Sequence, residues 1–213
     1  MTAASPVVVL RPATSAGGSD DAWDAAWAAH GRRALVPDLA VSPGLVVLES
    51  PGLTALAALS ASGADRAVLY GSGYGAMVAL HVAANYPERV AALVLSTANR
   101  LVDRQRRGIA DAAYGLLPVS RVQQLHAPQR RVLELLDQVR TVDWTAFAGR
   151  VRTPALVVVG ERDPLNRAPS RRLAAVLPES ELLVVPGARA GWTAHDPSAL
   201  ATAVAPFLER LGV

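Results

Sequence analysis

Short apolar runs alternate along the chain with longer segments in which apolar residues recur at helical spacing. The apolar runs are typical of strands buried on both faces of a sheet, and they lie at 7–10, 34–36, 66–70, 91–95, 155–159 and 181–185. The helical segments lie at 21–30, 53–61, 76–84 and 198–211, and residues 44–49 fit either a strand or a loop. This alternation predicts one α/β domain over residues 1–213, with a mostly parallel central sheet flanked by helices.

Three glycines spaced two apart mark the most informative part of the chain. Gly71, Gly73 and Gly75 join the apolar run 66–70 directly to the helical segment 76–84. The helix is expected to end before Pro87, because proline disfavours helical geometry in the residue before it. The strand 91–95 then follows. The segment therefore predicts a strand–helix–strand unit with a very tight first turn.

The turn resembles the nucleophile elbow of the α/β-hydrolase superfamily, whose motif is G-x-S-x-G between a strand and a helix. Its glycines are needed because side chains two positions from the apex would collide with the strand and the helix. In this frame the apex is Gly73, so the nucleophile is absent. A frame with Ser72 as the nucleophile would put Tyr70 and Tyr74 at the two cramped positions, and we therefore favour the first frame.

The same resemblance extends to the other members of a catalytic triad. T-P-A-L-V-V-V-G-E-R-D-P-L, from residue 153, resembles the family's strand leading to the acid and places Asp163 at that position. P-G-A at 186–188 resembles the lead-in to the catalytic histidine, which here is Ala190. His195 precedes an Asp-Pro pair typical of a helix N-terminus, so we interpret it as a surface residue at a helix entry in preference to a displaced base. Asp163 fits a catalytic role and a simple turn equally well.

Without a serine or a histidine, ordinary ester or amide hydrolysis is not expected. The resemblance implies that backbone N–H groups of Tyr74 and Ala13 still form an oxyanion hole, which could stabilise an enolate. Asp163, His195 or the substrate would then supply the base. The resemblance also implies that two antiparallel strands before 7–10 are missing and that residues 97–153 form a small helical cap. The residues expected to bind substrate are Arg11, Ser72, Gly73, Tyr74, Ser96, Arg189, Trp192 and His195.

Three functional hypotheses follow, in order of preference. The first is a non-hydrolytic enzyme of bacterial natural-product (peptide or polyketide) biosynthesis, acting as an epimerase, cyclase or lyase. The second is a catalytically inactive pseudo-hydrolase that binds a ligand or a partner. The third is a hydrolase with a displaced nucleophile, Ser72.

Composition narrows the chemistry further. The chain has no cysteine, which excludes disulfides, thiolate metal sites and a cysteine nucleophile. All 21 basic residues are arginine. The segment 100–152 contains ten of them and only five acidic residues. This positive segment could attract an anionic or carrier-bound substrate, although solvated helix faces explain it more simply.

Neither a signal-peptide pattern nor an apolar run of membrane-spanning length is visible. We therefore expect a cytoplasmic protein with a small-molecule or peptide substrate and no membrane or nucleic-acid partner. No metal or cofactor is expected, and the sequence leaves the oligomeric state open.

Overall fold

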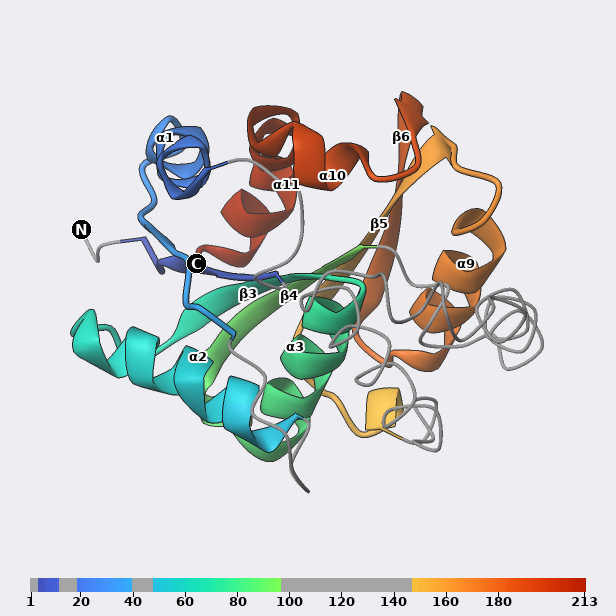
Figure 1. Cartoon of the computed structure of the whole chain (residues 1–213). Coiled ribbons are helices and arrows are strands. Elements are labelled where there is room, and N and C mark those ends of the chain that lie inside the picture. Colours follow the sequence, from blue (N-terminus) through green and yellow to red (C-terminus); the bar gives the residue numbers. More distant parts are fainter. Residues whose placement is uncertain (1–3, 12–18, 40–47, 97–146) are drawn as a thin grey trace, which may run out of the picture.

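A six-stranded sheet forms the centre of the computed structural model, which describes residues 4–11, 19–39, 48–96 and 147–213 (Figure 1). The strand order is β2-β1-β3-β4-β5-β6, and every neighbouring pair is parallel. The strands are β1 (Val7–Leu10), β2 (Ala34–Leu35), β3 (Ala67–Ser72), β4 (Val90–Ser96), β5 (Ala155–Arg162) and β6 (Ser180–Arg189). This confirms the predicted class, a mostly parallel sheet flanked by helices.

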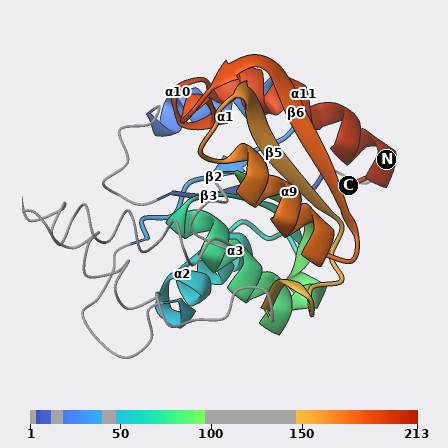
Figure 2. The same cartoon turned by 90° about the vertical axis from the view of Figure 1, so that its right-hand side faces the viewer.

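Helices cover both faces of the sheet, as the two views in Figures 1 and 2 show. One face carries α1 (Asp20–Ala28), α10 (Trp192–His195) and α11 (Pro197–Leu211). The other carries α2 (Glu49–Ala61), α3 (Tyr74–Asn85) and α9 (Arg167–Val176), and a short 3-10 turn, η1 (Pro87–Arg89), leads from α3 into β4.

Alternation along each strand divides the apolar core into two layers. In β1, Val7 and Val9 pack toward α1 and α11, whereas Val8 and Leu10 pack toward α2 and α3. Trp23 lies against Tyr70 of β3, with the ring centroids 5.1 Å apart. Trp27 is fully buried in the same layer, so the two tryptophans of α1 are core residues, as their spacing of four predicts.

Helix α2 begins earlier than the pattern predicts, at Glu49 instead of residue 53. Pro51 is tolerated there because the first turn of a helix does not use its N–H groups. A Cβ at Gly52 would lie 3.1 Å from Cγ2 of Val82, so the glycine permits close packing of α2 on α3. Residue 49 is therefore helical, and the rest of the candidate strand 44–49 lies outside the described residues apart from Leu48.

Most of the predicted cap, residues 97–146, also lies outside the described residues, so the cap at 97–153 stays a prediction. Its described end packs against the body of the domain. Ala148 and Val151 are buried in the α3 layer, and the ring of Phe147 lies 6.0 Å from that of His81.

Candidate functional site

The tight turn between β3 and α3 is centred on Gly73. Its φ of 56° and ψ of −114° lie in a region that residues with side chains rarely adopt. An added Cβ would meet no atom of the described residues within 4 Å. Among the described residues, the apex of the turn therefore has room for a side chain, although the residue there is glycine.

The two flanking glycines are different, because neither position can hold a side chain. A Cβ at Gly71 would lie 2.4 Å from the carbonyl oxygen of Gly75, and a Cβ at Gly75 would lie 1.8 Å from that of Leu10. A turn centred on Ser72 would put Tyr70 and Tyr74 at the cramped positions, but Tyr70 is a buried core residue of β3. The geometry agrees with the frame that has Gly73 at the apex.

Buried hydroxyl groups gather beside this turn on the α1 and α11 face. Tyr70 Oη lies 3.3 Å from Ser96 Oγ, which lies 3.2 Å from Thr193 Oγ1 of α10. Burial raises the pKa of Tyr70, and hydrogen bonds with Ser96, Thr193 and Ser72 oppose that rise. Ser72 thus interacts with the buried hydroxyl of Tyr70. Thr193 was not predicted, because no local pattern connects it with residues about a hundred positions earlier.

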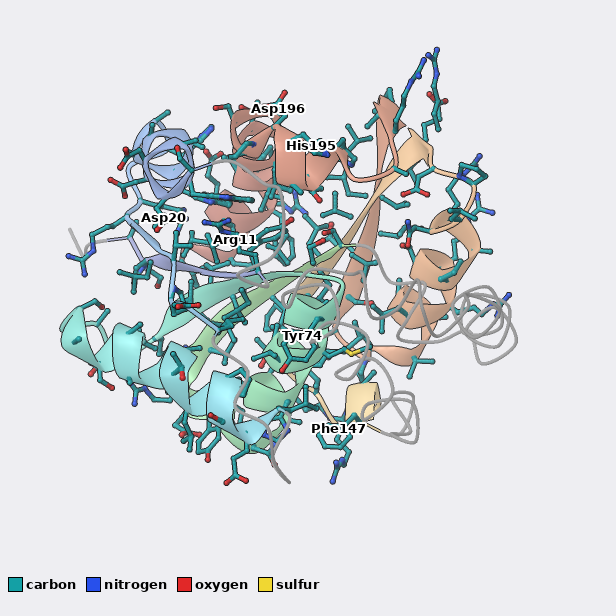
Figure 3. All side chains as sticks on the ribbon, in the orientation of Figure 1. Arg11, Asp20, Tyr74, Phe147, His195 and Asp196 are labelled. Atoms are coloured by element: carbon teal, nitrogen blue, oxygen red, sulfur yellow. The ribbon has the colours of Figure 1, made fainter. Side chains whose placement is uncertain are left out.

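Arg11 follows the last residue of β1 and stands next to the turn. The register pairs Leu10 with Gly71 and Ser72 with Ser96, so Arg11 is level with both serines. Its guanidinium forms an ion pair with Asp20, the first residue of α1 (Figure 3). Its Nε is buried and has no hydrogen-bond partner among the described residues.

Tyr74 is the first residue of α3, and its side chain packs in the layer below the sheet (Figure 3). Burial raises the pKa of its phenol. The N–H groups of a helix's first turn point away from the helix body and suit an anion. Gly73 N donates to the carbonyl oxygen of Ser96 at 3.2 Å, which fixes the turn to β4. The second expected donor, Ala13, lies outside the described residues.

Asp163 is only 4% exposed and lies just after β5. Its Oδ1 accepts from Asn166 N at 3.1 Å, and its Oδ2 accepts from Asn166 Nδ2 at 2.7 Å. Its own carbonyl accepts from Arg167 N at 3.1 Å. These contacts hold the turn into α9, and a role of Asp163 as a base stays a prediction.

The segment that resembles the histidine loop carries exposed side chains. Arg189 ends β6, Ala190 follows it, and both are exposed. His195 is exposed at the end of α10, and Figure 3 shows it on the opposite side of the sheet from Tyr74. Trp192, half-buried, packs against the α11 core.

The residue after His195 confirms the predicted helix start. Asp196 caps α11 by accepting from Ala199 N at 2.9 Å, and Pro197 follows as the first helical residue.

Within the described ranges, no group of three histidine, cysteine, aspartate or glutamate side chains could hold a metal ion. No helix in the described part of the chain combines the length and apolarity needed to cross a bilayer.

No family model and no curated protein matches the sequence, but solved structures do. A hydrolase from Pseudomonas aeruginosa is 24% identical, with a TM-score of 0.68 over 96% of this chain and 90% of that one. An α/β-hydrolase enzyme from a sediment metagenome of the Mar Chica lagoon, Morocco, is 16% identical, with a TM-score of 0.73 over 99% and 93%. An esterase from Rhodococcus sp. is 20% identical, with a TM-score of 0.66 over 99% and 92%. Together with the parallel sheet and its tight β3–α3 turn, these similarities establish that the chain has the α/β-hydrolase fold.

Proposed function

We propose that this protein is a non-hydrolytic enzyme that stabilises an enolate-type intermediate at the β3–α3 turn. The observation that carries the proposal is the geometry of Gly73, whose backbone makes the sharp turn while no atom of the described residues lies within 4 Å of a Cβ placed there. A substrate carbonyl could approach where a nucleophilic side chain would otherwise stand. Epimerisation next to a carbonyl passes through such an anion, as do cyclisation and elimination when they begin with removal of a proton from that carbon. The natural-product context is part of this proposal.

The stabilising groups in this proposal are backbone donors at the start of α3. Preorganised donors of this kind contribute about 3–4 kcal/mol each to a developing oxyanion. Tyr74 contributes the first one, and the proposal assigns the second to Ala13 or a neighbour. Because both are main-chain groups, the loss of a serine side chain does not remove them.

Two groups are candidates for the base that accepts the proton from the substrate carbon. Asp163 is the candidate on the chain, and the alternative is a basic group of the substrate itself. Both oxygens of Asp163 accept from Asn166, so Asp163 would act through the lone pairs that these bonds leave or by exchanging one bond for a bond with substrate. His195 is a weaker candidate, because it is exposed at the end of α10.

The same Asn166 contacts favour a second candidate function, a binding protein without catalysis. In that case Asp163 only shapes the turn into α9, and the space above Gly73 receives part of a ligand. The third hypothesis, hydrolysis through Ser72, is the least supported, because Ser72 precedes the apex and interacts with the buried Tyr70 hydroxyl.

Deuterium uptake distinguishes the first two functions. The protein would be incubated in D2O with a panel of peptidyl and β-keto thioesters, and exchange at the carbon next to the carbonyl would be followed by mass spectrometry. The enzyme proposal expects catalysed exchange that Asp163→Asn reduces strongly if Asp163 is the base. Asp65→Asn, an exposed carboxylate just before β3 and therefore at the opposite end of that strand from the turn, is the matched control.

Saturable binding with no exchange across the whole panel would instead favour the binding protein. Aryl-ester turnover that Ser72→Ala abolishes would support the third hypothesis and contradict the first.

A further inference from the structure

The side chain of Arg11 lies on the same face of the sheet as the hydroxyl groups beside the turn. Val7 and Val9 point to the α1 and α11 layer, and the alternation continues to Arg11, whose partner Asp20 begins α1. Ser72 and Ser96 end the next two strands at the same level. A cation and two hydroxyl groups therefore stand in a row at the carboxyl ends of three adjacent strands, where ligands bind in open α/β sheets.

The guanidinium is only partly used by the protein itself. The Arg11 side chain is 20% exposed, and the one ion pair it forms in the described part of the chain joins Nη2 to an oxygen of Asp20. Its Nε is buried without an acceptor there. A guanidinium presents its donors as a planar fork that fits both oxygens of a carboxylate, so this side chain retains binding capacity.

Asp20 is a poor permanent partner for this guanidinium. Its side chain is 67% exposed, and exposed ion pairs of this kind contribute little to stability. The carboxylate of a ligand held over the turn would be better shielded from water, which strengthens its attraction to the cation.

We propose that Arg11 binds a carboxylate group of the ligand and that Asp20 competes with that group for the guanidinium. The inference rests on the proposed function for the position of the ligand at the β3–α3 turn. It adds the chemical class of the ligand: a compound with a free carboxylate placed within reach of the carbonyl group above Gly73. One guanidinium matches the single charge of a carboxylate, whereas a phosphate dianion is usually bound by more than one cation.

The test measures binding and needs no turnover. Linear carboxylates from butyrate to decanoate, the matched primary amides and the matched alkyl phosphates would be titrated into the protein by calorimetry. The wild-type chain should bind the carboxylates at least about tenfold more tightly than the amides. Arg11→Gln should abolish this preference, and Arg11→Lys should retain part of it, because the charge remains without the fork.

Asp20→Asn gives the sharper test, because this substitution is expected to strengthen carboxylate binding. Removal of the competing carboxylate should tighten carboxylate binding several-fold and leave amide binding unchanged. Asp21→Asn is the matched control, since it removes the same charge from the same first turn of α1 without the contact to Arg11. Urea unfolding of each variant would establish that it is folded.

Equal binding of acids and amides, no binding of any acid, or equal effects of Asp20→Asn and Asp21→Asn would overturn the inference. Preference for the alkyl phosphates would also overturn it. None of these results bears on deuterium exchange at the turn, so the proposed function would be tested separately.

Discussion

The carbonyl oxygen of Leu10 lies where a side chain at Gly75 would begin. A Cβ built on Gly75 would come within 1.8 Å of that oxygen, so β1 and the first turn of α3 touch through their main chains. This contact seats the start of α3 directly against the central strand. It explains why the second flanking glycine of the turn is needed independently of any chemistry at Gly73.

This contact predicts different costs for alanine at the glycines of the turn. Gly75→Ala should prevent stable folding or remove most of the stability, because backbone atoms must move apart. Gly73→Ala should lower the free energy of unfolding by only about 1–3 kcal/mol, the cost of an unfavourable φ. Urea unfolding measures both.

Gly31→Ala is the control for the φ cost alone, because Gly31 has a φ of 68° and open space around its Cβ direction. The loss of unfolding free energy in Gly31→Ala should resemble that in Gly73→Ala. A Gly75→Ala protein as stable as either would contradict the contact.

The alanine at position 190, where related sequences are expected to carry the catalytic histidine, predicts that Gly73→Ser does not create an efficient esterase. A serine Cβ would meet no described atom at the apex, but position 190 is an alanine and His195 is exposed at the end of α10. Loss of the base alone costs on the order of 10⁶ in turnover in a well-studied serine protease. Stopped-flow and steady-state assays with p-nitrophenyl esters would measure the rate.

Rapid hydrolysis by Gly73→Ser would show that a base reaches the apex after all. The double variant with His195→Ala would then identify it: a loss of that activity would assign the base to His195.

Burial of His81 predicts that stability falls in weak acid. Desolvation lowers the pKa of His81 below its ordinary value of 6.5, and the charge of Glu49 opposes this. The unfolded chain therefore binds the proton more readily than the folded protein. Stability from this residue is complete above the unfolded pKa and is lost as the pH falls below it.

Urea unfolding between about pH 7.5 and 5 measures this slope. His81→Gln should flatten the slope in this window. Glu49→Gln should steepen it, because the favourable charge that raises the pKa is gone. Identical slopes in all three proteins would contradict the assignment.

Arg32 connects two distant parts of the chain and should contribute more to the free energy of unfolding than Arg33, its exposed neighbour. It is 8% exposed, and its guanidinium donates to the carbonyl oxygen of Ser5 at 3.1 Å and to that of Val213. Burial lowers the pKa of Arg32, and the charge of Glu209 opposes this. Arg32→Ala should lower the free energy of unfolding by about 3 kcal/mol, because hydrogen bonds with a charged donor are lost.

Arg33→Ala is the matched control, since Arg33 is exposed and donates only to Ser62 O at 3.3 Å among the described contacts. It should cost less than about 1 kcal/mol. Equal losses of unfolding free energy in Arg32→Ala and Arg33→Ala, measured by thermal and urea unfolding, would show that the buried contacts of Arg32 do not contribute to stability.

Local patterns were sufficient for the elements and for the frame of the turn. The apolar run at 7–10 is β1 with the predicted bounds, Trp23 and Trp27 are core residues at helical spacing, and Asp196 caps α11. The spacing of the turn's glycines gave the correct geometry because each follows from contacts within a few residues. The early start of α2 was missed, and the close packing of Gly52 on Val82 in that first turn involves another helix, which local spacing does not show.

The candidate site was only partly visible in the sequence. Arg11, Ser72 and Ser96 were expected near the pocket, because all three follow or end predicted strands. Thr193 was not, since its hydroxyl reaches Ser96 across 97 positions of chain. The ambiguity over Asp163 was also local in origin, and only the contacts of Asn166 with both of its oxygens show what this carboxylate does in the fold.

The sequence by itself determined the fold and the absence of a serine at the apex, because periodicity and glycine spacing act over one or two turns of chain. Only the tertiary structure decided which polar groups lie together beside the turn. The pairing of Arg11 with Asp20 and the cluster of Tyr70, Ser96 and Thr193 depend on strand register and on how helices lie over the sheet. Those arrangements are set by the packing of the whole core, which no short stretch of sequence encodes.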